Sequence, residues 1–577
     1  MAFLDVVGLI SVMPFLALLG NPESLHNNSL LFGVYKGIRY FGINSTDEIL
    51  FVLGIISFLL ILVSSSFRIF ANYKINLAIE MLRLTLGTRT LKITLSRPYI
   101  YFLDKHSGDL SKSVLADVDQ AIINVVRPVI NMVAYTFVLL AIILILFIVS
   151  PKITILTGIL YFSLYAIIFK LIKKKLSYYG DIITNQNGKR FVASNEAFTG
   201  IKIIKMLNCE DSYVKHFEKP SLTFCKNTAN YQTTIQIPNY LIEAVIFGTL
   251  LLISLVLMSQ YGGAGTKAFS QILPTLGLFA FAAYRLKSSL QFIFNGFSSI
   301  RYGKAIVNKL HDVTFDKSSV ARSSCNHIRK IFFKKFIEIK NLSFTYPNTG
   351  KLSVDNINFR IAKGTSIGIV GSSGAGKTTL VDIILGLLRP QKGGINVDGL
   401  VVDDETIVSW QALLGYVPQE IFLTDSSIYE NIAFGIPFNQ IDKSKVIECA
   451  KMAQIHNFIN EELENGYETF VGERGVRLSG GQRQRIGIAR SLYNDPEILV
   501  FDEATSALDG LTEKSVMHAI EKLAGKKTII IIAHRIGTVK NCDQIVYLEN
   551  GKTLATGNFE GLINSSDKFK QMALSSL

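Results

Sequence analysis

The stretch GSSGAGKTT, Gly371 to Thr379, has the residue types and the spacing of a loop that holds phosphate groups. It follows the strand-like TSIGIV at 365–370 and precedes the helix-like LVDIILGLL at 380–388, which is the context that this pattern requires. The glycines let backbone N–H groups surround phosphate oxygens at a helix N-terminus, and Lys377 would reach the β and γ oxygens. The hydroxyl of Thr378 would coordinate Mg²⁺, so the loop predicts a nucleoside triphosphate site rather than an ordinary glycine-rich turn.

A second segment offers two carboxylates at the end of a buried strand. EILVFDE, Glu497 to Glu503, is an apolar run that ends in Asp502 and Glu503. Such a strand end delivers Asp502 to the magnesium ion, while Glu503 orients or deprotonates the attacking water. Two solvated acids at a strand end are the plainer interpretation, but a phosphate loop in the same chain favours catalysis.

Between these segments lies LSGGQRQRIGIARSL, Leu478 to Leu492, and with it the chain resembles the ABC transporter superfamily. Other motifs of that family occur in its order: FTYP with Tyr346, YVPQ with Gln419, VGERG at 471–475, SALD at 506–509 and IIAHR with His534. The resemblance implies ATP hydrolysis, with catalytic residues Glu503, His534 and Lys377 and magnesium ligands Thr378, Gln419 and Asp502. The ATP-binding residues that it implies are Tyr346, which would stack on adenine, and Gly371, Ser372, Ser373, Gly374, Ala375, Gly376, Lys377, Thr378, Thr379, Gln419, Ser479, Gly480, Gly481, Gln482 and Asp509.

The signature segment also implies an assembly. A Ser-Gly-Gly turn that opens a helix presents N–H groups and a positive dipole end to a γ-phosphate. The resemblance implies that Ser479 and Gly481 of one cassette close over the phosphate loop of a second cassette. Because this chain carries a complete set of motifs, two copies would form two complete sites, and we expect a homodimer.

The composition places the chain in a membrane. Of its 577 residues 49% are hydrophobic and 18% are charged, and the apolar residues are concentrated in the first half. Candidate spans, each near the ~20 residues that cross a bilayer, lie at 6–20, 49–67, 128–151, 153–169, 244–266 and 268–284. The net charge of +14 comes from basic residues that flank these runs, which favours a membrane surface and disfavours nucleic acid. The five cysteines have no CxxC spacing and are typical of free thiols in a reducing compartment.

The polar stretches predict the topology and the domains. Residues 71–127 and 170–237 are long, helix-patterned and basic, so the positive-inside rule puts them in the cytoplasm. We expect a membrane α-helical bundle of six transmembrane helices, followed by an α/β P-loop ABC nucleotide-binding domain. The expected ranges are 1–310 for the transmembrane domain, 311–334 for a linker and 335–577 for the nucleotide-binding domain. The first span is expected to be shortened, or to have lost its first turns to a late start codon.

The layout resembles a half-transporter of the type IV exporters. In that group long cytoplasmic loops transmit the closure of the cassettes to the membrane helices. The midpoints of the two loops, LADVDQAI at 115–122 and EAFTGIKIIK at 196–205, look like the group's coupling helices.

Basic residues near the inner ends of two spans are candidates for meeting a negatively charged substrate. Arg285 lies ~26 Å along the sixth candidate span at ~1.5 Å per residue, near the cytoplasmic headgroups, and Lys287 follows it. Both are snorkelling anchors in one interpretation. In the other, they and Arg68 flank a wet cavity. The polar stripe that would line it consists of Tyr284, Ser288, Gln291, Asn295 and Ser298.

Three segments, ISVMPFLALL, FRIFANY and AAYRLKSSLQFI, look most like the PglK-type flippases of lipid-linked oligosaccharides. This resemblance implies a lipid-linked oligosaccharide or a similar anionic glycolipid as substrate, in a bacterial inner membrane with the nucleotide-binding domain in the cytoplasm. Three alternatives stay open: an exporter of other lipids, peptides or hydrophobic compounds, a non-transporting ATP-gated regulator, and an inactive truncated paralogue.

Overall fold

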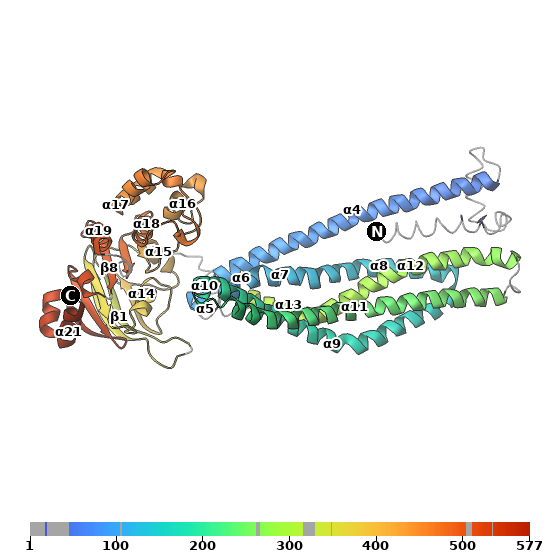
Figure 1. The fold of residues 1–577 in the computed structure, drawn as a ribbon, viewed down its shortest axis with the longest axis horizontal. Coiled ribbons are helices and arrows are strands. Elements are labelled where there is room, and N and C mark those ends of the chain that lie inside the picture. Colours follow the sequence, from blue (N-terminus) through green and yellow to red (C-terminus); the bar gives the residue numbers. More distant parts are fainter. Residues whose placement is uncertain are drawn as a thin grey trace. The chain divides into compact units, whose positions relative to one another are not determined.

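The computed structural model describes residues 46–103, 105, 107–260, 266–315, 329–347, 349–503, 510–533 and 535–576, together with Phe15, Leu18 and Leu19. The chain forms two compact units (Figure 1). The first unit comprises Met1–Arg97 and Asp104–Val320. The second comprises Ala321–Leu577 and the short segment Pro98–Leu103, which is therefore contributed to it from within the helical part of the sequence.

The first unit is built from helices. They are α4 (Thr46–Leu95), α6 (Ser107–Val114), α7 (Ala116–Ala121), η1 (Ile122–Val126), α8 (Arg127–Val149), α9 (Pro151–Thr199), α10 (Ile201–Leu207), α11 (Glu210–Gln260), α12 (Thr266–Tyr302) and α13 (Lys304–Phe315). Within the described part of the chain, four helices are long and apolar enough to cross a membrane: Asp47–Leu95, Leu110–Ile148, Pro151–Thr199 and Glu210–Val256. The second and fourth predicted spans lie within these helices, and the third runs from α8 into the start of α9. The fifth begins in α11 and continues past its end at Gln260 into residues outside the described part of the chain. The sixth lies within α12, and the first falls outside the described residues apart from Phe15, Leu18 and Leu19.

Close contacts hold the long helices together. Only Ser150 separates α8 from α9, so the two helices form a tight hairpin. The ring of Tyr135 stacks on that of Phe292 at a centroid distance of 4.1 Å, which joins α8 to α12. Gly180 allows α9 to approach α12, because a Cβ at that position would overlap the carbonyl oxygen of Tyr302. The second of the two predicted coupling segments forms the connection α10 between α9 and α11.

The first predicted coupling segment is in a different place from the one we expected. LADVDQAI at 115–122 forms α7 inside the first unit, where Asp117 and Val118 are buried and Asp117 pairs with Lys309 at 2.7 Å. The segment that contacts the nucleotide-binding unit is instead α5 (Tyr99–Leu103), whose residues Tyr99 and Ile100 pack on the core of that unit. The sequence prediction was wrong here because a six-residue amphipathic turn shows no preference for one neighbour over another.

The second unit is an α/β domain with two sheets. The antiparallel sheet has the strand order β2-β1-β4-β5 and the larger sheet has the order β10-β9-β3-β8-β7-β6. The strands are β1 (Phe336–Phe344), β2 (Val354–Ala362), β3 (Ser366–Gly371), β4 (Lys392–Val397), β5 (Leu400–Val401), β6 (Leu414–Val417), β7 (Ile498–Asp502), β8 (Thr528–Ala533), β9 (Gln544–Glu549) and β10 (Lys552–Gly557). The strands β9, β3, β8, β7 and β6 are parallel to one another, and only β10 is antiparallel to its neighbour.

The second unit also contains helices, of which α16 and α17 extend away from the sheets (Figure 1). The helices are α14 (Lys377–Ile384), α15 (Ile407–Ala412), α16 (Ile428–Ile432), η3 (Phe438–Gln440), α17 (Lys443–Met452), η4 (Phe458–Glu462), η5 (Gly466–Glu468), η6 (Glu473–Gly475), α18 (Gly480–Leu492), α19 (Gly510–Glu521), η7 (Ile536–Val539), α20 (Phe559–Ser565) and α21 (Asp567–Ser576). Continuous apolar runs form the central strands, because a parallel sheet is buried on both faces. All six residues of β8 are buried. β3 and β7 are parallel and are separated by β8, so their carboxyl ends lie at the same edge of the sheet, where the motif residues follow.

Candidate functional site

The loop that follows β3 adopts backbone conformations that require glycine. Gly374 and Gly376 have φ angles of 77° and 96°, in the left-handed region that favours glycine. A Cβ on Gly376 would overlap the carbonyl oxygen of Ser353, and one on Gly371 would overlap that of Leu548. The loop is thus held between β3, β2 and β9, and it delivers Lys377 as the first residue of α14.

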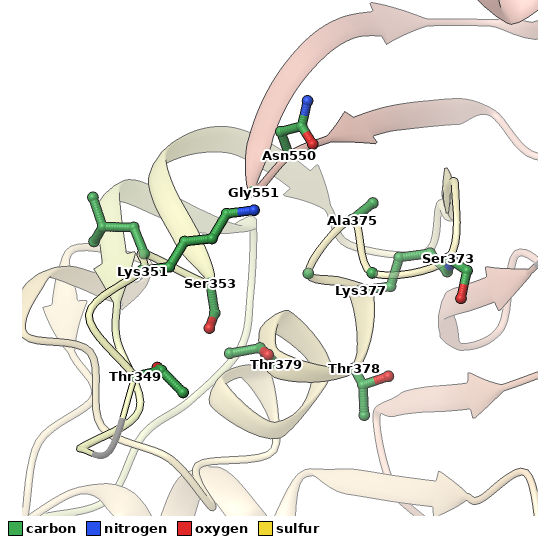
Figure 2. A pocket seen from close by; sticks show the side chains of 13 residues that line it. Thr349, Lys351, Ser353, Ser373, Ala375, Lys377, Thr378, Thr379, Asn550 and Gly551 are labelled. Carbon is green, nitrogen blue, oxygen red and sulfur yellow. The ribbon is translucent and has the colours of Figure 1, made fainter.

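This loop lines a cavity of about 380 Å³ (Figure 2). The residues that line it are Thr349, Lys351, Leu352, Ser353, Ser373, Gly374, Ala375, Gly376, Lys377, Thr378, Thr379, Asn550 and Gly551. Seven of the nine residues predicted from GSSGAGKTT therefore face one hollow, at the N-terminus of a helix whose dipole favours anions.

Two neighbouring segments complete the cavity, and the sequence analysis missed them: residues of 349–353 before β2, and the turn between β9 and β10. Asn550 and Gly551 form a two-residue hairpin turn between β9 and β10, with φ angles of 50° and 78°. The Gly551 N–H donates to the carbonyl oxygen of Ala375 at 3.1 Å, so the turn lies against the phosphate loop. Asn-Gly is a strong hairpin signal in a sequence, so the turn was recognisable, but its position beside the loop was not.

Lys377 points into the loop that precedes it. Its ammonium group donates to the carbonyl oxygens of Gly371 at 2.8 Å and Ser372 at 3.1 Å. Burial lowers the pKa of Lys377, while the negative charges of Glu503 and Asp502 oppose that effect. The lysine therefore lies near both carboxylates at the end of β7, which brings the two predicted motifs into one site.

Gln419 and Glu503 are in direct contact. The Nε2 group of Gln419, which follows β6, donates to Oε2 of Glu503 at 2.7 Å. Glu503 has a φ angle of 48°, an uncommon conformation for a residue with a side chain, and its N–H donates to the carbonyl oxygen of Ile532. Strained residues of this kind occur at functional sites, where the surrounding structure holds them in place.

A group of polar side chains surrounds Asp502 on the side of α14. The hydroxyl of Tyr416 donates to Oδ2 of Asp502 at 3.3 Å. Burial raises the pKa of Asp382 to about 6, and the negative charge of Asp502 adds to the effect. The pKa of Tyr99 on α5 is raised by burial and then by the charge of Asp382. Sequence motifs gave no signal for Asp382, Tyr416 or Tyr99, because these contacts join segments far apart in the chain.

Tyr346 lies at the edge of the cavity. It follows β1, its ring packs edge-on against Phe344 at a centroid distance of 5.0 Å, and its hydroxyl lies 3.2 Å from Oγ1 of Thr379. Since Thr379 lines the cavity, the aromatic ring stands next to the predicted phosphate site, as an adenine-binding residue would.

The signature segment opens α18 but is not part of this cavity. Ser479 caps the helix: its Oγ accepts from the N–H of Gln482, and its own N–H donates to Oε1 of Gln482 at 2.7 Å. Among the described residues that line the cavity, none belongs to 479–482. Two further predicted residues, Asp509 and His534, lie outside the described residues.

The candidate substrate residues lie on two helices of the first unit. Arg68 is on α4, while Arg285 and Lys287 are on α12. The ammonium of Lys287 pairs with Oε2 of Glu243 on α11 at 2.6 Å. The guanidinium of Arg285 lies 5.7 Å from the ring centroid of Phe281. The sequence analysis missed Glu243, which stands directly before the fifth candidate span.

Comparison with known families finds two matches that cover separate parts of the chain. Residues 354–506 match the family described as ABC transporter. Residues 36–281 match the family described as ABC transporter transmembrane region.

Individual proteins are also similar. The heterocyst differentiation ATP-binding protein HepA of Nostoc sp. is 31% identical over 522 residues, which are 88% of this chain and 82% of that protein. The alpha-hemolysin translocation ATP-binding protein HlyB of Escherichia coli O157:H7 is 44% identical over 234 residues, which are 40% of this chain and 32% of that protein. A solved structure of a bacterial Atm1-family ABC exporter with ATP bound aligns with a TM-score of 0.78 at 22% identity, over 99% of this chain and 98% of that one, and shows the fold.

Proposed function

The chain belongs to the ABC transporter family, and on that premise we propose that it is one half of a homodimeric exporter for an anionic glycolipid. It is a membrane protein and an ATP-hydrolysing transporter, with a helical transmembrane region followed by an α/β nucleotide-binding domain. The bacterial inner membrane, with the nucleotide-binding domain in the cytoplasm, is the location that we propose for it.

The observation that carries the ATPase part is the contact between Gln419 and Glu503 at 2.7 Å, beside Asp502 and Lys377. In our proposal Glu503 orients or deprotonates the attacking water, and Lys377 binds the β and γ phosphate oxygens. His534, which lies outside the described residues, is the third proposed catalytic residue.

The donor set at this site fits Mg²⁺. The carboxylate of Asp502 and the hydroxyl of Thr378 are oxygen ligands of the kind that Mg²⁺ prefers, and Gln419 adds an amide. When bound, the ion would neutralise charge on the phosphates. These three residues are the ligands that we propose.

Two features of the single chain support a second copy. The signature residues Ser479 and Gly481 are absent from the described lining of the chain's own cavity, as expected if they serve the cavity of a partner. The connection around α10 also carries apolar side chains that the described chain leaves exposed by 46–75%: Phe198, Ile201, Ile203, Met206 and Leu207. Burying these side chains on a second nucleotide-binding domain would be favourable.

The proposed substrate follows from the cations near the inner end of α12. Arg285 and Lys287 would contact an anionic headgroup, such as the pyrophosphate of a lipid-linked oligosaccharide, as it arrives from the inner leaflet. Glu243 would hold Lys287 in place until the substrate anion replaces it. Arg68 of either copy is the third proposed contact.

An exporter of another cargo is the second candidate. HlyB, which is similar to the nucleotide-binding part, is named for alpha-hemolysin translocation, and another similar protein is the heavy metal tolerance factor 1 of Caenorhabditis elegans. The intact pair of Gln419 and Glu503 favours transport over a non-transporting regulator or an inactive paralogue.

The deciding experiment measures flipping of a polyprenyl-pyrophosphate oligosaccharide in proteoliposomes, with wild type and Glu503→Gln in parallel. ATP-dependent flipping by wild type alone supports the proposal. ATP hydrolysis without flipping would reject the glycolipid substrate and leave the second candidate.

A charge reversal tests the substrate contact. Arg285→Glu should lower the ratio of substrate-stimulated to basal ATPase activity, because an anionic headgroup would then meet a negative charge. The matched control is Arg301→Glu, at an exposed position on the same helix. Equal ratios for the two variants would favour the snorkelling-anchor interpretation.

A further inference from the structure

The helices of the first unit enclose a second, larger hollow that the ATPase and the proposed substrate contacts do not use. Its volume is about 1110 Å³, and it lies between α6, α9, α11 and α13. Sites for small molecules typically measure about 300–1,000 Å³, so the hollow, which we call the basic pocket, has room for a ligand much larger than inorganic phosphate.

Positive charge dominates the lining of the basic pocket. Among the described residues that line it are five lysines and one histidine, and Asp181 is the single acidic residue of that set. The basic residues are Lys112, Lys189, Lys215, His216, Lys219 and Lys309. Lys309 is neutralised from outside the lining by Asp117 at 2.7 Å. The four other lysines therefore outnumber the acidic lining, although they come from three different helices.

This convergence of like charges costs free energy unless an anion lies between them. Lys215 and Lys219 are four residues apart on α11, so they share one face of the helix and repel each other. Within the described part of the chain, neither of them nor Lys189 on α9 has an ion-pair partner. Threonine, asparagine, glutamine and serine side chains also line the pocket and supply neutral hydrogen-bonding groups.

Lys112 forms the floor of the basic pocket. Its residue is only 4% exposed, and its ammonium lies 5.9 Å from the ring centroid of Phe191. A Cβ on Gly188 of α9 would stand 3.0 Å from this ammonium, so the absence of a side chain at Gly188 makes room for Lys112. One buried lysine and three exposed lysines, Lys189, Lys215 and Lys219, therefore line the same hollow, where they would attract an anion.

The position of the basic pocket along α9 indicates a soluble ligand. The basic run at 170–175 marks the inner membrane boundary, and Lys189 lies 14 residues beyond its end. At ~1.5 Å per residue the lysine stands ~21 Å further into the cytoplasm than that boundary. Lipid headgroups do not extend so far.

We propose that the basic pocket binds a soluble, multiply phosphorylated anion from the cytoplasm. Lysines act as point charges toward phosphate groups, and several of them together select a ligand with several phosphates. A bound anion bridges α6, α9 and α11 and so favours the helix arrangement seen here over others. The inference does not depend on which substrate the chain transports.

The test is isothermal titration calorimetry of the full chain with inositol hexakisphosphate as the probe. The protein is held in phosphatidylcholine nanodiscs and carries Lys377→Ala, so that the phosphate loop does not compete for the probe. We expect saturable binding of one probe per chain. The triple variant Lys189→Ala, Lys215→Ala and Lys219→Ala should weaken it about tenfold, since three charges that would face the anion are removed.

The matched control removes the same charge elsewhere. Lys174, Lys202 and Lys226 are exposed and lie outside the lining, so their triple alanine variant should bind the probe as wild type does. Equal weakening by the two triple variants would overturn the proposal, because the probe would then report only the net charge of the protein. Absence of saturable binding to wild type would overturn it as well.

A second pair of variants changes no charge. Gly188→Ala should shift the Lys112 ammonium by a few tenths of an ångström and so weaken probe binding. Gly158→Ala, on the same helix with nothing within 4 Å of the added Cβ, should leave the affinity unchanged. Both glycine variants keep the lysines. The comparison between them can therefore still be made if the triple lysine variant does not fold. Unchanged affinity in Gly188→Ala would contradict the role of Lys112.

Nanodiscs with phosphatidylglycerol separate a soluble ligand from a lipid headgroup. If the site is cytoplasmic, a change from phosphatidylcholine to phosphatidylglycerol should alter the affinity of wild type for the probe no more than it alters the affinity of the control triple variant. Loss of probe binding in these nanodiscs, restored in phosphatidylcholine, would mean that headgroups fill the pocket and would overturn the assignment to a soluble anion.

Discussion

Replacing Asp382 by asparagine should stabilise the second unit above neutral pH. Asp382 lies on α14, and its side chain has no hydrogen bond to another described residue. Burial and then the charge of Asp502 raise its pKa from 3.8 to about 6, so the ionised carboxylate is unfavourable in the folded protein. Asparagine has nearly the same shape and carries no charge, so it resembles the protonated form.

The magnitude follows from the pKa. A rise from 3.8 to about 6 is roughly 2 pKa units, or about 3 kcal/mol at ~1.4 kcal/mol per unit. Part of the carboxylate is open to solvent, and screening reduces this figure to about 1–2 kcal/mol. Because the folded state binds the proton more tightly, this contribution is lost as pH rises from ~4 through ~6, and the loss is complete above pH ~7.

Thermal unfolding of wild type and Asp382→Asn at pH 4.5 and pH 7.5 measures the effect. For a domain of this size about 1–2 kcal/mol corresponds to a Tm increase of roughly 2–8 °C in the variant at pH 7.5. At pH 4.5 the carboxyl of the folded wild type is still largely protonated, so the difference in Tm should be much smaller than at pH 7.5. A variant that is less stable at pH 7.5, or that gains equally at both pH values, would refute the reasoning.

Asp398 provides a control, because its replacement should change the Tm in the opposite direction. Its carboxylate accepts hydrogen bonds from the N–H groups of Lys334, Lys335 and Phe336, and these bonds hold its pKa below the ordinary value against the effect of burial. Its contribution to stability is therefore present above pH ~4 and is lost as pH falls through the folded-state pKa. Asp398→Asn should lower the Tm at pH 7.5, where Asp382→Asn raises it.

Three further outcomes are expected. Glu503→Gln should still bind ATP, because the amide keeps the size of the side chain, but phosphate release should fall about 10²–10⁴-fold; undiminished release would contradict the proposed role. Gly376→Ala should weaken ATP binding more than Gly374→Ala, since its Cβ would overlap a backbone carbonyl whereas nothing lies within 4 Å of the other; equal losses would show that only the φ angle matters. Glu243→Gln should free Lys287 for an anionic substrate and lower the concentration that half-maximally stimulates the ATPase; an unchanged value would separate Lys287 from the substrate site.

The sequence by itself determined those features whose residues follow one another in the chain. The phosphate loop at 371–379 and the strand end with Asp502 and Glu503 are short motifs, whose residue types and spacing can be read within a few consecutive residues. The same holds for the apolar runs that form membrane helices, because a bilayer requires about 20 residues in succession. For this reason the fold class followed from the sequence, and so did the motif segments of the proposed ATP site.

Tertiary structure decided which distant segments meet. Tyr99 on α5, rather than the expected segment at 115–122, contacts the nucleotide-binding unit, and the Asn550–Gly551 turn closes the ATP cavity beside the phosphate loop. Lys287 gained a counter-charge in Glu243, which lies 44 residues away in the chain. Contacts of this kind depend on helix and strand packing in three dimensions, and the free energy that selects them is spread over many side chains, so no short motif records them.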